Sequence, residues 1–321
     1  MSDSTPQMIL HHYPNSPFSE KVRLMMGLKG LRWGSVFAPD IAPKPDLVAL
    51  TGGYRRIPVL QVGADIYCDT ALIADVIEHV APTPGLYPAQ QRGLARIVAQ
   101  WADDKLFWAA MGYNFTGAAE MFKAQAPHEA AAAQRMQAFA DDRSRMFVNM
   151  TRLRPADATS AYRSYLRRLA TLLDDGQPYL LGDAPTVADL AAYAPLWFTR
   201  TRVPALAGIL AATPSITPWM DRVAAIGHGT PVPMGADEAI LIANRSEPAS
   251  VAHDTFQDDH RLALGTRVSV CAESFGGEVT TGDLMAATRT QVTLRRHDER
   301  AGTVFVHFPR VGYSLRKADT P

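Results

Sequence analysis

The chain has 321 residues, of which 47% are hydrophobic and 20% are charged. That length allows two or three domains, and that composition is typical of a globular protein rather than a disordered one. Basic and acidic residues both number 32, so the formal net charge is zero and the charge balance gives no support for a nucleic-acid partner. Two cysteines, Cys68 and Cys271, are too few for a disulfide scaffold.

The pattern of apolar residues excludes two further classes. No apolar run approaches the roughly 20 residues that a membrane span needs. Residues 1–7 (MSDSTPQ) show no basic region followed by an apolar core, so no secretory signal is visible. We therefore expect a cytoplasmic protein with no nucleic-acid and no membrane partner.

Residues 8–30, MILHHYPNSPFSEKVRLMMGLKG, predict a short strand, a polar turn and an amphipathic helix. The turn brings Tyr13, Asn15 and Ser16 to the helix N-terminus, where free N–H groups and the helix dipole favour negative charge. The apolar residues of the helix fall on one face: Phe18, Val22, Met25 and Met26.

The chain up to residue 85 predicts one α/β unit. A second strand follows, then a proline- and glycine-rich loop with a short helix, then a hairpin, then a helix that Asp69 or Thr70 caps. The order β-α-β-β-β-α is that of a thioredoxin-like sheet with helices on both faces. A cis bond before Pro58 would turn the main chain of Ile57 toward Ser16. The predicted segments are 33–37 (strand), 46–50 (helix), 59–62 and 65–67 (hairpin strands).

Three blocks of this unit resemble the N-terminal domain of cytosolic, bacterial-like glutathione S-transferases. They are SPFSEKVRLMMGLKG (16–30), YRRIPVLQ around Pro58, and CDTALIADVIE (68–78). The family pattern is a Ser- or Cys-Pro-aromatic turn, a basic residue before Val- or Ile-Pro, and an acidic residue with Ser or Thr opening a helix. The three blocks stand in the family's order and at its separations.

The resemblance implies a glutathione site. The main chain of Ile57 would pair with the cysteinyl part, Asp69 would take the γ-glutamyl ammonium, and Thr70 would take its carboxylate. Arg56 or Lys44 would meet the glycyl carboxylate. The alternative for Asp69 and Thr70 is a helix cap alone. The implied binding residues are Ile57, Pro58, Asp69, Thr70, Arg56 and Lys44.

The resemblance does not single out the residue that stabilises the thiolate. Members of the family use Tyr, Ser or Cys in the turn, and we rank Ser16 first, Tyr13 second and Asn15 third. The alternative for Ser16 is that it only caps the helix. Ser16 and Ser19 stand where a thioredoxin has its two cysteines, which excludes dithiol redox chemistry at this turn.

Two other residue types invite a chemical role. His11 and His12 are adjacent on a strand, so their rings point to opposite faces and we expect no metal site. Cys68 adjoins the implied site, but a cysteine at a strand end is more often a small buried hydrophobe.

Residues 86–250 predict a helical domain. The block QPYLLGDAPTVADLAAYAPLWF (177–198) contains Thr186 and Asp189 in a capping box, and it is similar to the buried helix of the family's C-terminal domain. We assign these two residues a structural role. By resemblance, this domain would form the wall of a site for an apolar electrophile. The candidate wall residues on the predicted long helix are Trp101, Phe107, Trp108, Met111, Tyr113 and Phe115.

Residues 251–321 lie outside the resemblance. They predict short strands about ten residues apart with glycine-rich turns, which indicates a small all-β domain, an SH3-like barrel or roll. Covering the helical domain, extending a dimer contact and closing over the site are all open roles. We interpret His307, Arg310 and Tyr313 as a tight turn with a packed aromatic ring rather than a site.

The sequence thus predicts three domains: thioredoxin-like α/β (1–85), all-α (86–250) and small all-β (251–321). The resemblance implies a homodimeric enzyme that binds glutathione, uses no metal, and adds the thiolate to a small hydrophobic electrophile. Two alternatives stay open: a non-catalytic binding or structural protein with this fold, and a glutathione-dependent lyase or isomerase.

Overall fold

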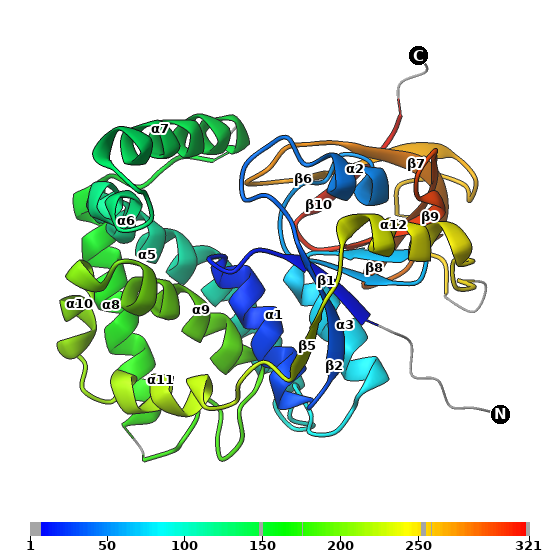
Figure 1. Ribbon diagram of the computed structural model, residues 1–321. Coiled ribbons are helices and arrows are strands. Elements are labelled where there is room, and N and C mark those ends of the chain that lie inside the picture. The colour runs from blue at the N-terminus through cyan, green and yellow to red at the C-terminus, as the bar shows by residue number, and fades with distance from the viewer. Residues whose placement is uncertain (1–7, 148–149, 175, 252–254, 258, 319–321) are drawn as a thin grey trace.

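The computed structural model describes residues 8–147, 150–174, 176–251, 255–257 and 259–318 (Figure 1). A mixed sheet stands beside a helical domain, and α1 (Pro17–Leu28) lies between them. None of the described helices is long and apolar enough to cross a bilayer.

The N-terminal part has the predicted thioredoxin-like layout. β1 runs parallel to β2 and antiparallel to β3, and β3 pairs antiparallel with β4. Alternation along β1 divides the core, because Leu10 faces α1 and the helical domain whereas Ile9 faces α12 (Ala236–Arg245). The strands are β1 (Met8–His12), β2 (Arg32–Phe37), β3 (Val59–Val62) and β4 (Asp65–Cys68); the helices are α1, α2 (Pro45–Thr51) and α3 (Thr70–Val80).

The helical domain confirms the predicted all-α region. The single long helix expected after residue 89 is instead divided by a π-helical turn, η1 (Ala102–Leu106). The flanking segments are α4 (Arg92–Trp101), α5 (Phe107–Asn114), η2 (Phe115–Gly117), α6 (Ala118–Lys123) and α7 (Glu129–Met146). The later segments are α8 (Pro155–Leu173), α9 (Val187–Arg202), η3 (Pro204–Leu206), α10 (Gly208–Ala211) and α11 (Ile216–Ala224). α12 lies within the predicted helical region but packs on the sheet, against α2 and β9.

The capping box at the start of α9 is present. The Thr186 side chain accepts from the Ala188 N–H, and Asp189 accepts from the Thr186 N–H. Asp189 is fully buried and also accepts from Trp219 Nε1 at 2.9 Å. These contacts join α9 to α11 and support the structural role assigned to the pair.

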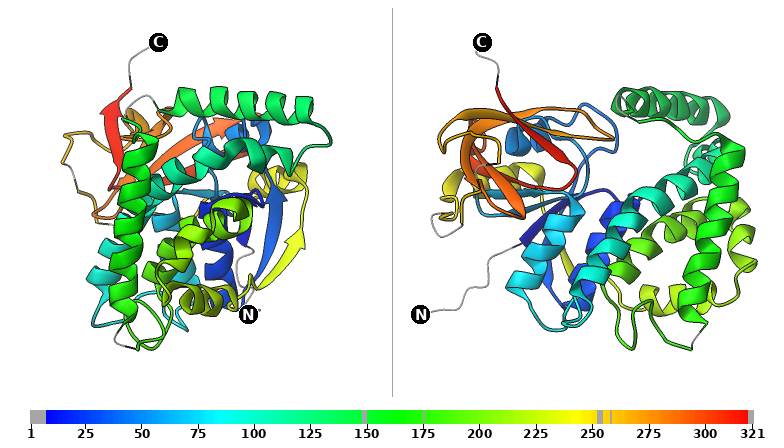
Figure 2. Two further views of the ribbon diagram at one scale, coloured as in Figure 1. Left: turned by 90° about the vertical axis from the view of Figure 1, so that its left-hand side faces the viewer. Right: turned by 180° about the vertical axis from the view of Figure 1, so that it is seen from behind.

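The C-terminal strands confirm an additional all-β region, and they continue the N-terminal sheet. We call β6–β10 the C-terminal module. β9 pairs in parallel with β4, the edge strand of the thioredoxin-like unit, and β5 pairs in parallel with β2 at the other side. The sheet order is β10-β6-β7-β8-β9-β4-β3-β1-β2-β5. Seen from behind, the orange-to-red C-terminal module lies to one side of the molecule and the green helical domain to the other (Figure 2, right). The strands are β5 (Thr230–Pro233), β6 (Arg267–Ala272), β7 (Thr280–Ala287), β8 (Gln291–Asp298), β9 (Gly302–Pro309) and β10 (Tyr313–Lys317).

A buried polar chain marks the seam between β4 and β9. His307 is 3% exposed, and its ring contacts Asp65 Oδ1 at 2.8 Å and Thr293 Oγ1 at 2.9 Å. Its ring also stacks on Tyr67 with centroids 4.4 Å apart. Both ring nitrogens are thereby satisfied inside the seam, as a buried imidazole requires.

His11 and His12 are buried on β1 and engage different partners. His11 Nε2 contacts Gln61 Oε1 at 2.8 Å, and His12 contacts Ser35 Oγ at 2.9 Å and an Arg23 guanidinium nitrogen at 3.1 Å. Burial lowers the pKa of His11 to about 4 and, together with the Arg23 charge, that of His12 to about 3.

These histidines predict loss of stability in mild acid. Each has a folded pKa below its unfolded value of 6.5, so the unfolded chain binds more protons than the folded chain as the pH falls through 6.5. The resulting loss of stability levels off near pH 4 for His11 and near pH 3 for His12. We expect the free energy of unfolding in urea to fall by about 2 kcal/mol per histidine between pH 7.5 and pH 5. His11→Gln should make this pH dependence shallower, whereas His79→Asn, at an exposed histidine, should leave it as in the wild type. A wild-type stability that is flat over this range would contradict the assignment.

Candidate functional site

The turn before α1 places Ser16 as the N-cap of the helix. Its Oγ accepts from the Ser19 N–H at 3.1 Å, and the residue is 2% exposed. Because the oxygen is the acceptor in that bond, the hydroxyl proton remains available to donate to a ligand. Ser16 therefore caps the helix, and this role leaves its hydroxyl proton free to donate to a ligand.

Tyr13 is close to Ser16, whereas Asn15 makes an exposed contact with the helical domain. Burial raises the pKa of the Tyr13 phenol, the nearby Arg143 guanidinium opposes the rise, and Ser16 lies within hydrogen-bonding reach. The phenol is thus protonated at neutral pH and can donate. Asn15 instead donates to Gln125 Oε1 at 3.2 Å, in an exposed contact.

Ile57 and Pro58 are joined by a cis peptide bond. Among the described residues, none forms a hydrogen bond with the main-chain N–H or C=O of Ile57. Backbone polar groups need partners, so these two are open to the main chain of a peptide-like ligand.

Asp69 and Thr70 begin α3. Asp69 has φ of 77°, an unusual value for a residue with a Cβ, and its Oδ1 accepts from the Ala71 N–H at 3.0 Å. The Thr70 N–H is the first of the helix and has no hydrogen-bond partner within the described part of the chain. The pair is a cap, and it also leaves the Thr70 N–H without a partner among the described residues.

A buried lysine fixes the direction of the Thr70 hydroxyl. Lys21 Nζ donates to Thr70 Oγ1 at 3.0 Å and to Asp103 Oδ2 at 2.5 Å, and Lys21 is fully buried. An ammonium only donates, so the Thr70 hydroxyl accepts from it and its own proton points elsewhere.

Asp103 completes this group from η1, and the sequence reasoning did not select it. Its Oδ1 is buried and has no hydrogen-bond partner among the described residues. Burial raises the pKa of Asp103, Lys21 opposes the rise, and the charge of Asp69 adds to it. A π-helical turn often marks a functional site, but the local sequence WADDKL predicts only solvated helix charge.

These groups together can bind an α-amino-acid head group. The Thr70 N–H and hydroxyl are donors for a carboxylate, whereas Asp69 and the unpaired Oδ1 of Asp103 are acceptors for an ammonium. A helix N-terminus that offers donors to a carboxylate and acceptors to an ammonium matches a zwitterion better than a simple anion.

The two cations expected at a glycyl carboxylate are both engaged. Arg56 contacts Asp69 Oδ2 at 3.4 Å and donates to the Tyr313 hydroxyl. Lys44 Nζ donates to the Arg55 carbonyl at 3.1 Å, and burial lowers its pKa to about 8.

Aromatic side chains gather between α1, α5 and the C-terminal module. Phe18 and Phe107 have ring centroids 4.5 Å apart, and Phe107 adjoins Trp108 at 4.9 Å. Trp108 in turn contacts Phe147 at 5.1 Å and Phe275, in the β6–β7 connection, at 5.0 Å. Four candidate wall residues have other surroundings: Trp101 against Tyr165, Met111 in the core, Tyr113 bonded to the Leu206 carbonyl, and Phe115 against Phe139.

Within the described residues, the geometry indicates neither a metal site nor a reactive thiol at Cys68. The part of the chain that the structure describes contains no group of three or more His, Cys, Asp or Glu placed to hold a metal ion. Cys68 is fully buried, and burial raises the pKa of its thiol, which agrees with a small buried hydrophobe.

Comparison with known proteins places this geometry in a family. Residues 10–85 match the family model "Glutathione S-transferase, N-terminal domain", and residues 129–222 match "Glutathione S-transferase, C-terminal domain". A GST-like protein from Pseudomonas syringae is 38% identical, with a TM-score of 0.79, over 97% of this chain and 100% of that one. The chain belongs to the glutathione S-transferase family. None of the curated proteins compared with it matches its sequence.

Two glutathione S-transferase structures share only the fold. The enzyme from Rhodospirillum rubrum F11 is 22% identical with a TM-score of 0.50, over 68% of this chain and 87% of that one. The Tau class enzyme from mango is 19% identical with a TM-score of 0.50, over 68% of this chain and 89% of that one. The greater coverage by the Pseudomonas syringae protein indicates that it shares the C-terminal module.

The buried pair of Lys21 and Asp103 predicts a large effect on stability. Lys21→Met would leave the Asp103 carboxylate without a counterion, which we expect to lower the free energy of unfolding by about 3–5 kcal/mol. Lys21→Met with Asp103→Leu should recover most of that loss, because both charges are then gone.

Chemical denaturation measures both effects. The exposed pair Lys105 and Asp104, on the same π-helical turn, is the matched control. Lys105→Met should leave the free energy of unfolding nearly unchanged. Equal losses for Lys21→Met and for the double variant would show that the pair is not coupled.

Proposed function

We propose that this protein binds glutathione and adds its thiolate to an electrophilic, apolar cosubstrate. The observation that carries the proposal is the set of unpaired groups around α3. The N–H and hydroxyl of Thr70 suit the γ-glutamyl carboxylate, and the buried, unpaired Oδ1 of Asp103, together with Asp69, suits its ammonium. The open main chain of Ile57 suits the cysteinyl part.

The proposed chemistry needs one deprotonation and one displacement. The glutathione thiol releases its proton to solvent, and the thiolate accepts a hydrogen bond from the Ser16 hydroxyl, with the Tyr13 phenol as a second donor. Donation to the sulfur lowers the thiol pKa and raises the fraction of nucleophile. With an aryl halide, the sulfur forms a bond to the ring carbon and halide leaves, so no external oxidant or reductant is needed.

The aromatic group formed by Phe18, Phe107 and Trp108 supports an apolar cosubstrate. These rings lie beside the helix that Ser16 caps. Family membership also supports a cytoplasmic homodimer, and we propose both for this protein. The domain boundaries at residues 85 and 250 remain part of the same proposal.

A non-catalytic binding protein is the second candidate. It is favoured by the surroundings of Ser16, which is almost fully buried and already satisfies the Ser19 N–H. Such a protein would retain glutathione without lowering the thiol pKa.

Retention and turnover distinguish the two. We expect the protein to be retained on immobilised glutathione and to convert 1-chloro-2,4-dinitrobenzene, with Ser16→Ala lowering kcat/KM by about a hundredfold. Tyr13→Phe should lower it less, and Asn15→Ala should leave it near the wild-type value. Retention without turnover would favour the binding protein, and absence of retention would refute the glutathione site.

Thr70 tests the head-group assignment. Thr70→Val keeps the shape of the side chain but removes the hydroxyl, both as donor to the ligand and as acceptor from Lys21, so we expect the affinity for glutathione to fall about tenfold. Thr70→Ser retains the donor and is the matched control. Calorimetric titration of glutathione measures both, and equal affinities for the two variants would contradict a role for the hydroxyl.

A further inference from the structure

The hydroxyl of Tyr313, in the C-terminal module, lies among the residues proposed to bind glutathione. Tyr313 is the first residue of β10 and is 8% exposed. Its hydroxyl donates to Asp69 Oδ2 at 3.0 Å and accepts from Arg56. The interpretation of Tyr313 as a packed ring is therefore correct for the ring and incomplete for the hydroxyl.

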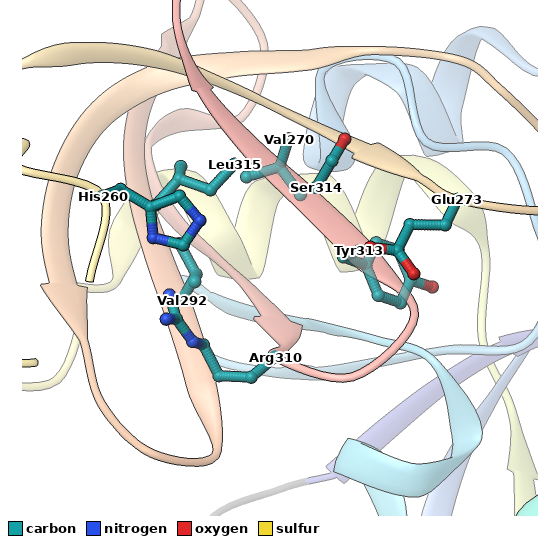
Figure 3. A pocket seen from close by; sticks show the side chains of 8 residues that line it. All are labelled: His260, Val270, Glu273, Val292, Arg310, Tyr313, Ser314 and Leu315. Atoms are coloured by element: carbon teal, nitrogen blue, oxygen red, sulfur yellow. The ribbon is translucent and has the colours of Figure 1, made fainter.

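The ring of Tyr313 packs inside the C-terminal module, whereas its hydroxyl lies next to Asp69, outside the module. The Tyr313 ring lies 5.5 Å from that of Phe308 and lines a hollow of about 220 Å³ in the module. Figure 3 shows Tyr313 beside Glu273 at one end of this hollow and His260 at the other. Because the ring is fixed by β-strand neighbours, the hydroxyl has a fixed position next to Asp69.

The direction of the hydrogen bonds follows from the donor types. A guanidinium only donates, so the phenol oxygen accepts from Arg56 and its single proton goes to the nearest acceptor. That acceptor is Asp69 at 3.0 Å, since the Tyr54 hydroxyl is 3.4 Å away. The direct contact of Arg56 with Asp69, at 3.4 Å, is longer than the roughly 2.7–2.9 Å of a close charge-assisted bond.

We propose that Tyr313 is a positioning residue for recognition of the γ-glutamyl ammonium. Its hydroxyl holds the Asp69 carboxylate in place and keeps Arg56 from forming a close ion pair with it, so the charge of Asp69 stays available to the ligand. The proposal rests on the glutathione site proposed above. It assigns part of that site to the C-terminal module, which lies beyond both matched family models.

The test compares glutathione with its analogue that lacks the α-amino group, N-glutaryl-cysteinylglycine. The readout is the ratio of the two dissociation constants, measured by calorimetry on the full chain. We expect the wild type to prefer glutathione about tenfold or more, and Tyr313→Phe to reduce that preference about three- to tenfold. In turnover, Tyr313→Phe should raise KM for glutathione and leave kcat nearly unchanged.

Two further variants separate positioning from folding. Ser314→Ala removes a hydroxyl of the same strand that bonds to the Cys271 carbonyl, so it should keep the wild-type ratio. Tyr313→Phe with Arg56→Met removes the cation that would otherwise neutralise Asp69, so it should recover much of the preference. Because a ratio is compared, any loss of glycyl binding caused by Arg56→Met affects both ligands and cancels.

The outcomes are distinguishable. If the wild type binds neither ligand, the proposed glutathione site is wrong and the role of Tyr313 falls with it. If the wild type discriminates and Tyr313→Phe discriminates equally well, only the role of Tyr313 is overturned. Equal weakening of both ligands by Tyr313→Phe, or no recovery in the double variant, would also overturn it, because either result indicates a structural role alone.

Discussion

The pairing of β9 with β4 is the contact on which the rest of the molecule depends. An edge strand exposes main-chain donors and acceptors, and pairing with β9 satisfies those of β4. Across the same pair of strands, the His307 ring contacts Asp65 and Thr293. Because the sheet is then continuous, β10 and the β6–β7 connection are held beside the first domain. The Gly276 N–H also bonds to the Met146 carbonyl at 2.8 Å, which ties the module to the end of α7.

Two charge networks flank the start of α3, and each contains a hydroxyl. Lys21 forms a close ion pair with Asp103 and also donates to Thr70, whereas the Tyr313 hydroxyl bonds to both Arg56 and Asp69, whose direct contact is longer. In a low-dielectric setting such networks hold their members rigidly, and any group left unpaired is a strong site for a complementary ligand. These hydrogen bonds and ion pairs thus fix the side chains at one end of the candidate site without a ligand.

Short-range patterns predicted the fold and part of the site. Strand alternation, helix periodicity and the caps at Asp69 and Thr186 depend on neighbours a few residues apart, and those elements form as expected. The pairing of β9 with β4 could not be predicted, because alternation shows which face of a strand is buried but not which edge it joins. Asp103 was missed because its burial depends on Lys21, 82 residues away in sequence.

The seam between β4 and β9 also has a consequence for the order of folding. His307 and Asp65 are 242 residues apart in sequence, so their contact closes a very long loop, and such non-local pairings form late. The local thioredoxin-like unit, from β1 to α3, can form earlier, with the β4 edge exposed and prone to pair with other chains. Docking of β9 both covers that edge and brings Tyr313 to Asp69. The step that completes the sheet therefore also brings Tyr313 into the proposed site.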